Sequence, residues 1–178
     1  MAKIVECVPN FSEGRDKAVI EAIVDEVRKT AGVKLLDYSS DTDHNRTVVT
    51  FVGGPEGVRE AAFRLAKKAG ELIDMSVHQG GHPRMGATDV IPFIPIADVT
   101  MEDCAALARA VGQRIGEELA VPVYLYEDAA TRPERKNLSD VRKGQYEGFF
   151  EKIKDADWRP DYGPAAMNAK ARATAVGA

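Results

Sequence analysis

Apolar residues along the chain fall into two kinds of stretch, short runs and longer amphipathic stretches. Short runs rich in branched residues predict strands, at 4–8, 33–38, 47–52, 90–96 and 121–126. Between them, apolar side chains recur every three or four positions at 19–27, 58–72 and 104–119, which predicts three amphipathic helices. The predicted order is strand, helix, two strands, helix, strand, followed by a further helix and strand.

Polar residues and prolines mark the ends of these elements. Ser12 or Asp16 can cap the first helix, and Pro55 suits the first turn of the second. Thr100 begins the third helix with Asp103 at the capping-box offset. The apolar run 90–96 contains two prolines, which cannot donate to a strand ladder, so we expect them at an edge or a bulge.

The order of elements predicts an α+β fold, a ferredoxin-like α/β sandwich with an added helix and strand, in which helices cover one face of the sheet. A chain of 178 residues suits one domain. We expect its compact part to span about residues 1–160. The remainder, 161–178, ends in small residues without apolar periodicity and is expected to be a loose tail.

Charge and composition exclude several classes of function. The formal net charge is −4, from 24 basic and 28 acidic residues, so we expect no nucleic-acid partner. Glu6 interrupts the apolar start where a secretory signal would be continuous, and no run is long enough to cross a bilayer, which predicts a cytoplasmic protein without a membrane partner. Cys7 and Cys104 lie far apart in apolar patterns, which predicts free buried thiols rather than a disulfide or metal site.

The densest polar chemistry lies between the second helix and the fourth strand, in the stretch 78–90. Gly80, Gly81 and Gly86 permit positive φ or close approach of the backbone to a ligand, and a proline at 83 stiffens the chain beside His82. His78 precedes and Arg84 follows, so the loop presents a base beside a cation. A solvated glycine-rich turn and a functional site both explain this pattern, and the local density of donors and acceptors favours a site.

A second polar stretch, 127–154, carries five closely spaced basic side chains: Arg132, Arg135, Lys136, Arg142 and Lys143. The first interpretation is a solvated surface arm, which includes a short helix near 146–154. The alternative is a binding site for an acidic tail such as a polyglutamate.

Five strings, in this order, resemble the amino-terminal half of the glutamate formiminotransferases. They are Glu6–Gly14, Asn45–Thr47, His82–Ala87, Pro122–Tyr126 and Asp161–Pro164. The resemblance runs the length of the chain and extends to formimidoyltransferase-cyclodeaminases. It implies a ferredoxin-like half of a two-part enzyme that moves a formimino group between N-formimino-L-glutamate and tetrahydrofolate in histidine breakdown. Tetrahydrofolate is then a co-substrate, and no metal is implied.

The resemblance also implies a site. The histidine of the family's His-Pro-Arg-Met-Gly motif, which has the acid-base role, corresponds to His82. Gly163, Pro164 and Ala165 correspond to the start of a folate-contacting segment. As substrate-binding residues we further predict Asn10, Asn45, Arg46 and Arg84, with Arg84 on a substrate carboxylate and the two asparagines on the amidine. For Asn10, stabilisation of its own turn explains the residue equally well.

The sequence departs from the family at three places. Gly81 stands where many members have a glutamate, and Met167, Lys170, Ala171 and Arg172 differ from the usual folate segment. The chain also ends where the carboxy-terminal half of the family begins, so the partner is expected to be a second copy or a separate chain with that half. Two alternative functions stay open: a folate-binding module or subunit that is not catalytic alone, and a related transferase that handles 5-formyltetrahydrofolate.

Overall fold

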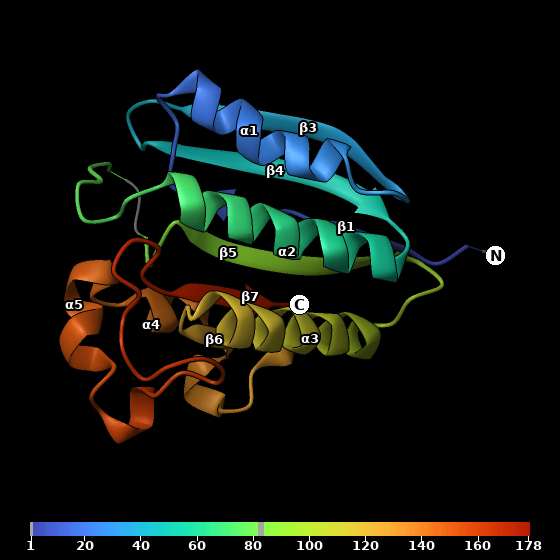
Figure 1. The fold of residues 1–178 in the computed structure, drawn as a ribbon. Helices are drawn as coiled ribbons and strands as arrows, with labels where there is room; N and C mark the ends of the chain where they lie inside the picture. Colours follow the sequence, from blue (N-terminus) through green and yellow to red (C-terminus); the bar gives the residue numbers. More distant parts are fainter. Residues whose placement is uncertain (1, 82–83) are drawn as a thin grey trace.

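The computed structural model describes residues 2–81 and 84–178 (Figure 1). The strands in these ranges are β1 (Ile4–Cys7), β2 (Asn10–Phe11), β3 (Val33–Asp41), β4 (Arg46–Gly53), β5 (Thr88–Ala97), β6 (Val123–Tyr126) and β7 (Thr174–Gly177). The α-helices are α1 (Lys17–Arg28), α2 (Pro55–Leu72), α3 (Met101–Leu119), α4 (Leu138–Arg142) and α5 (Gln145–Lys152). Short 3-10 helices lie at Glu127–Ala129, Pro133–Arg135 and Ala156–Trp158.

The described strands form one mixed sheet. β3 pairs with β4. The short strands β1 and β2 follow one another along the chain and occupy the same position in the sheet, between β4 on one side and β5 on the other. All of these pairings are antiparallel, and their order with the two crossing helices is ferredoxin-like. β7 and β6 then extend the sheet in parallel beyond β5. The predicted α+β sandwich is confirmed.

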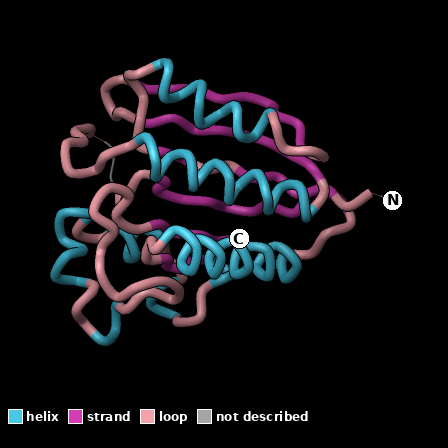
Figure 2. The backbone as a smooth tube through the Cα atoms, viewed as in Figure 1, coloured by secondary structure: helices cyan, strands magenta, loops and turns pink. Residues whose placement is uncertain are grey.

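The helices lie on both faces of the sheet, so the prediction that they cover one face is wrong. α1, α2 and α3 cover one face together (Figure 2), over a core that includes Phe51 and Phe93. On the opposite face, Val141 of α4 and Phe149 of α5 pack with Tyr124 and Tyr126 of β6. The physical reason is that all four residues of β6 are buried, so each face of this strand needs its own cover.

The predicted loose tail is wrong for β7, which is an inner strand between β5 and β6. All four of its residues are buried. A parallel strand covered on both faces shows no alternation of apolar and polar residues, and small side chains suit the narrow space beneath α3. The pattern of the sequence therefore could not distinguish this strand from a flexible end.

The structure confirms the predicted starts of the three long helices and shows where the two prolines of β5 lie. Asp16 caps α1, Pro55 lies in the first turn of α2, and Thr100 forms a capping box with Asp103 at the start of α3. Pro95 lies next to a register shift between β1 and β5, as the bulge prediction required. Pro92 lies opposite Val8 in the break between β1 and β2, so no regular ladder exists on that side, while on its other side it is in register with Gly177 of β7. β5 is thus an inner strand, and neither proline lies in an edge strand of the sheet.

Candidate functional site

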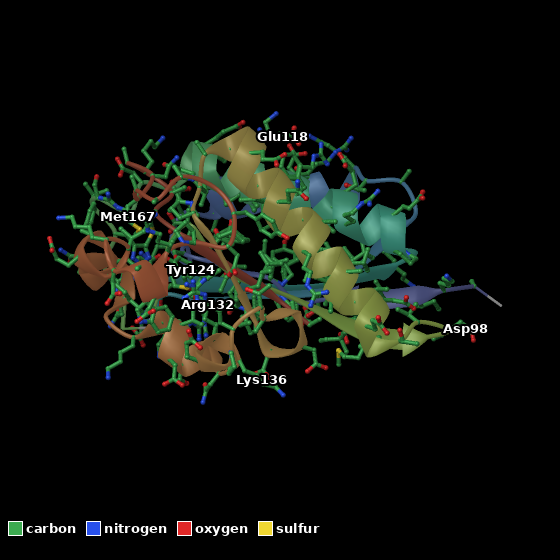
Figure 3. The ribbon with its side chains drawn as sticks, turned by 90° about the horizontal axis from the view of Figure 1, so that it is seen from below. Asp98, Glu118, Tyr124, Arg132, Lys136 and Met167 are labelled. Carbon is green, nitrogen blue, oxygen red and sulfur yellow. The ribbon has the colours of Figure 1, made fainter. Side chains whose placement is uncertain are left out.

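The described residues of the segment between α2 and β5, 73–81 and 84–87, include Gln79 and Gly80, which lie against the turn between β3 and β4 at one end of the sheet. In Figure 3, Met167 lies near this end and Asp98 at the opposite end of the molecule. The glycines of the segment allow close backbone approach: a Cβ on Gly80 would come within 2.3 Å of the carbonyl oxygen of His44, and one on Gly86 within 2.0 Å of that of Ala173. At Gly81 the nearest atom would be 3.8 Å away, so that glycine is not needed for packing.

Asn45 joins three segments at this end. It has a left-handed φ of 52°, which asparagine tolerates better than most residues. Its side-chain oxygen accepts from the Gly14 amide at 2.8 Å, and its side-chain nitrogen donates to the Gln79 carbonyl at 3.0 Å. The predicted substrate residue Asn45 therefore holds the loop before α1 and the segment 73–87 to the β3–β4 turn.

His78 and Arg84 form a buried polar pair, each with 7% of its surface exposed. Arg84 donates from Nε to His78 Nδ1 at 2.8 Å. On the other side of the ring, His78 Nε2 lies 3.2 Å from the backbone oxygen of Asn45. An arginine has no acceptor, so Nδ1 must accept, and the ring hydrogen of neutral His78 is on Nε2.

Burial sets the charge state of His78. Desolvation lowers the pKa of its imidazole, and the nearby guanidinium of Arg84 lowers it further, while the contact with Asn45 acts in the opposite direction. The ring is therefore neutral at physiological pH, in agreement with the hydrogen-bond pattern.

Arg84 also reaches across to α5. Its Nη1 donates to the side-chain oxygen of Gln145 at 2.7 Å, and its Nη2 lies 3.2 Å from the carboxylate of Glu147. The side chain of Glu147 is 55% exposed, against 9% for Arg84. The carboxylate partner of this buried guanidinium thus comes from the solvent side, where a substrate carboxylate could replace it.

Buried side chains also hold the other end of the glycine-rich segment. Asp89 accepts the Met85 amide at 2.6 Å and pairs with Arg142 of α4. Ser12 donates from its hydroxyl to the carbonyl of Gly86 at 2.8 Å. The chain is therefore anchored at Met85 and Gly86, the last two residues of the motif, and Ser12 serves this contact rather than the predicted helix cap.

The predicted acid-base residue His82 lies outside the described residues, as does Pro83. The structure describes the residues on either side, Gly81 and Arg84. The acid-base role of His82 therefore stays a prediction.

Asn10 and Arg46 share the sheet face opposite α1 and α2. Asn10 of β2 is paired with Val48 of β4, and Arg46 lies two residues before Val48, so all three side chains project to the same side. Both polar residues are half-buried. Asn10 donates to the carbonyl of Val8 at 3.4 Å, which is the local contact that the alternative explanation of this residue requires.

The predicted folate-contacting segment begins away from the sheet face that carries Asn10 and Arg46, and residues further along it lie beside the motif. Gly163, with φ of 86°, lies against the end of α3, where a Cβ would come within 2.6 Å of the Val121 carbonyl; Pro164 and Ala165 follow it and are exposed. Further along, Ala171 accepts the Ala87 amide at 2.9 Å. The structure thus brings residues 171–173 beside 85–87, whereas 163–165 contact other elements.

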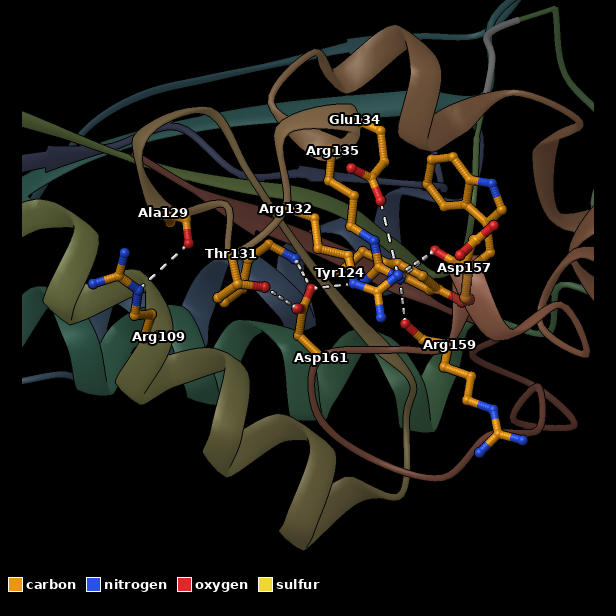
Figure 4. A network of polar contacts seen from close by, with 12 residues as sticks. Arg109, Tyr124, Ala129, Thr131, Arg132, Glu134, Arg135, Asp157, Arg159 and Asp161 are labelled. Atoms are coloured by element: carbon orange, nitrogen blue, oxygen red, sulfur yellow. Dashed lines mark hydrogen bonds and ion pairs between the residues drawn. The ribbon is translucent and has the colours of Figure 1, made fainter.

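Two of the five closely spaced basic side chains between residues 132 and 143 are structural. Arg135 has 1% of its side chain exposed and is paired with Asp161 at 3.1 Å. It also donates to the backbone oxygens of Asp157 and Arg159 (Figure 4). Arg142 is paired with buried Asp89. Neither a solvated arm nor an acidic-tail site describes these two arginines, because their charges are already paired inside the fold.

Sequence reasoning assigned no role to Asp89, Gln145 or Glu147, and it noted His78 only as a neighbour of the motif. Asp89 carries a usable signal, since a carboxylate at the start of an apolar strand needs a partner. Gln145 and Glu147 carry no such signal, because they lie some 60 residues away on a separate helix.

The sequence comparisons decide the family. The formiminotransferase domain, N-terminal subdomain, matches residues 4–178. The chain belongs to this family. A glutamate formimidoyltransferase of Streptococcus pyogenes serotype M1 is 57% identical over 178 residues, which cover 100% of this chain and 60% of that protein. A glutamate formimidoyltransferase of Thermoplasma acidophilum is 50% identical over 177 residues, covering 98% of this chain and 58% of the relative.

A formimidoyltransferase-cyclodeaminase of Mus musculus is 53% identical over 178 residues, which cover 100% of this chain and 33% of that longer protein. This formiminotransferase N-terminal subdomain therefore spans at most 60% of the length of these curated relatives.

Within residues 2–81 and 84–178, no group of three or more His, Cys, Asp or Glu side chains is arranged to hold a metal ion. In the same ranges, no helix combines the length and apolarity needed to cross a membrane. Cys7 and Cys104 are buried free thiols, and burial raises the pKa of both.

Proposed function

We propose that this chain is the amino-terminal part of a glutamate formimidoyltransferase, which transfers a formimino group between N-formimino-L-glutamate and tetrahydrofolate. The observation that carries the proposal is the 57% identity, over all 178 residues, to a glutamate formimidoyltransferase. The buried contacts that anchor both sides of the His82 motif support it, because a catalytic group requires a rigid setting.

The reaction forms one bond and breaks another at the amidine carbon. N5 of tetrahydrofolate attacks this carbon, and the tetrahedral intermediate expels the nitrogen of glutamate. His82 takes the proton that N5 loses and returns one to the departing nitrogen, so no net proton is consumed at the imidazole. Such acid-base help is typically worth about 10²–10⁴ in rate.

The other predicted residues take binding roles in this proposal. Arg84 Nη2 binds a carboxylate of formiminoglutamate in the place now taken by Glu147. Asn10 and Arg46 present polar groups on the face that α1 and α2 leave open. Asn45 acts on the amidine indirectly, because its side chain holds Gln79 and with it the glycine-rich segment in place. Gly163, Pro164 and Ala165 contact folate, and the exposure of this turn leaves it accessible.

We further propose a cytoplasmic protein that associates with a second copy or with a chain that supplies the remaining part of the family's enzyme. Ile94 and Ile96 support association, because they are 37% and 53% exposed on the sheet face that α1 and α2 leave open. Sedimentation velocity measures this directly: a wholly monomeric protein at micromolar concentration contradicts self-association.

The decisive experiment measures formimino transfer by wild-type protein and by the His82→Gln variant. We expect a loss of about 10²–10⁴ in kcat with tetrahydrofolate affinity retained. His44→Gln is the matched control, since His44 pairs with Asp41 on the surface with 48% of its side chain exposed. Unchanged turnover in His82→Gln removes this residue from the mechanism.

The same assay separates the alternatives. Binding of tetrahydrofolate without turnover, with turnover restored by a carboxy-terminal-half protein, indicates a subunit that is not active alone. Faster reaction with 5-formyltetrahydrofolate than with the formimino substrate indicates the related transferase.

A further inference from the structure

Arginine chemistry fixes which atom donates and which accepts in the hydrogen bonds of His78. Arg84 can only donate, so its Nε–H bond at 2.8 Å requires a lone pair on His78 Nδ1. The hydrogen of the neutral ring then lies on Nε2, where the Asn45 backbone oxygen accepts it at 3.2 Å. A protonated ring would present N–H to N–H at the Arg84 side and place two cations in contact within a buried site.

With Nε held by the His78 ring, Arg84 directs both Nη groups toward α5, and Nη2 also lies 3.5 Å from the backbone oxygen of His78. One of them meets Gln145, whose φ of 52° places this non-glycine residue in the left-handed region. Such a conformation is unfavourable for a residue with a side chain and persists where surrounding contacts maintain it. The other meets the exposed carboxylate of Glu147. The ring contact at 2.8 Å is the shorter of the two contacts through which His78 helps to set the direction of the guanidinium.

We propose that His78 is a positioning residue that holds Arg84 in the orientation that binds the substrate carboxylate, and that only its neutral form does so. This inference rests on the proposed function for the identity of the substrate. It predicts that substrate affinity falls in acid, and it assigns this fall to protonation of His78 rather than of His82, the proposed acid-base residue.

The surroundings of the ring agree with a neutral His78. Glu13 and Arg15 face it from the segment after β2, and Arg84 faces it from its own segment. Glu147 on α5 reaches it only through Arg84. His44 of the β3–β4 turn packs against Gly80 rather than against the ring. Burial dominates these charges and lowers the pKa of His78.

NMR of the imidazole and guanidinium nitrogens tests the state of His78 without any enzyme activity. At pH 7.5 we expect a neutral His78 ring with its hydrogen on Nε2, and a hydrogen-bonded Arg84 Nε–H signal. Acidification should protonate His78 and shift the Arg84 signal at the same pH. A hydrogen on Nδ1 at pH 7.5, or an Arg84 signal that ignores the titration, overturns the proposal.

Two variants test the effect on substrate binding. His78→Asn places an oxygen where Nδ1 was, so it accepts from Arg84 but does not titrate. His78→Leu is unable to accept. We expect His78→Leu to raise KM for N-formimino-L-glutamate about 10-fold to 100-fold, as loss of a hydrogen bond to a charged group does, with a much smaller change in kcat.

His78→Asn should restore most of the affinity and abolish the rise of KM between pH 7.5 and 5.5. A KM rise of wild-type size in His78→Asn overturns the proposal, as does a pure kcat effect in His78→Leu. Circular dichroism of each variant separates misfolding from loss of positioning. If wild-type protein neither binds nor converts the substrate, the proposed function fails, and the NMR titration still decides whether neutral His78 holds Arg84.

Discussion

The carboxylate of Asp89 accepts a hydrogen bond from the backbone N–H of Met85 at 2.6 Å, and its second oxygen pairs with Arg142. Asp89 is 1% exposed, whereas the side chain of Arg142 is 20% exposed, so the pair joins a buried carboxylate to a partly solvated guanidinium. This one side chain connects the start of β5, the end of the glycine-rich segment and α4.

Replacing Asp89 with Asn should therefore be costly. The change leaves Arg142, whose side chain is 20% exposed, without its counterion. Removal of one partner of a buried pair typically costs about 3–5 kcal/mol of unfolding free energy, and the partial solvation of Arg142 places the expected loss at the lower end of this range. Urea denaturation measures the loss. Asp128→Asn, at an exposed position, is the matched control and should change stability by no more than about 0.5 kcal/mol. Equal stability of the two variants would mean that the Asp89 pair contributes nothing.

Two glycine-to-alanine changes should have opposite effects on the free energy of unfolding. In Gly86→Ala the new Cβ would come within 2.0 Å of the Ala173 carbonyl oxygen, so β5 and the segment before β7 must separate. We expect a loss of about 2 kcal/mol or more. In Gly148→Ala, inside α5, a Cβ meets no atom within 4 Å, and higher helix propensity should add about 0.5–1 kcal/mol. Thermal unfolding distinguishes these outcomes, and stabilisation by Gly86→Ala would contradict the close approach.

Glu147→Gln tests whether this carboxylate competes with substrate for Arg84. Removing the internal anion should lower KM for N-formimino-L-glutamate, by about 2-fold to 5-fold for a half-exposed pair, and leave kcat nearly unchanged. Glu151→Gln on the same helix, whose carboxylate is paired with Lys154 at the surface, is the control and should leave KM unchanged. A higher KM in Glu147→Gln would instead assign Glu147 to binding of the substrate.

Stability should fall in mild acid because of His78. Its pKa is lowered in the folded state, so the unfolded chain, with an ordinary value of about 6.5, binds more protons as pH falls through that value. The contribution is complete above pH about 6.5 and decreases below it. Urea unfolding at pH 7.5 and 5.5 should show a smaller loss in His78→Asn than in wild type. An equal loss in the two proteins would exclude His78 as its source.

Local patterns were sufficient to predict the first part of the fold. The strand 4–8, the strand pair after residue 32 and the three long helices were predicted from spacing, and caps such as Asp16 and Thr100 are where their residue types indicate. For the site, the glycine-rich segment was correctly singled out as a meeting point of polar groups. The partners of Arg84 were not predictable, since Gln145 and Glu147 approach it only through packing of α5 against the sheet.

The sequence by itself determined the family and the ferredoxin-like order of elements, because strand and helix periodicities and the motif strings are local properties of the chain. Tertiary structure decided the rest. Residues 174–177 became an inner strand because β5 and β6 offer unpaired backbone groups on both sides. His78 became an acceptor for Arg84 because the fold buries the ring and brings the guanidinium to its Nδ1 and the Asn45 carbonyl to its Nε2. Hydrogen-bond satisfaction in a buried site depends on what the whole fold brings there, and no local pattern encodes that.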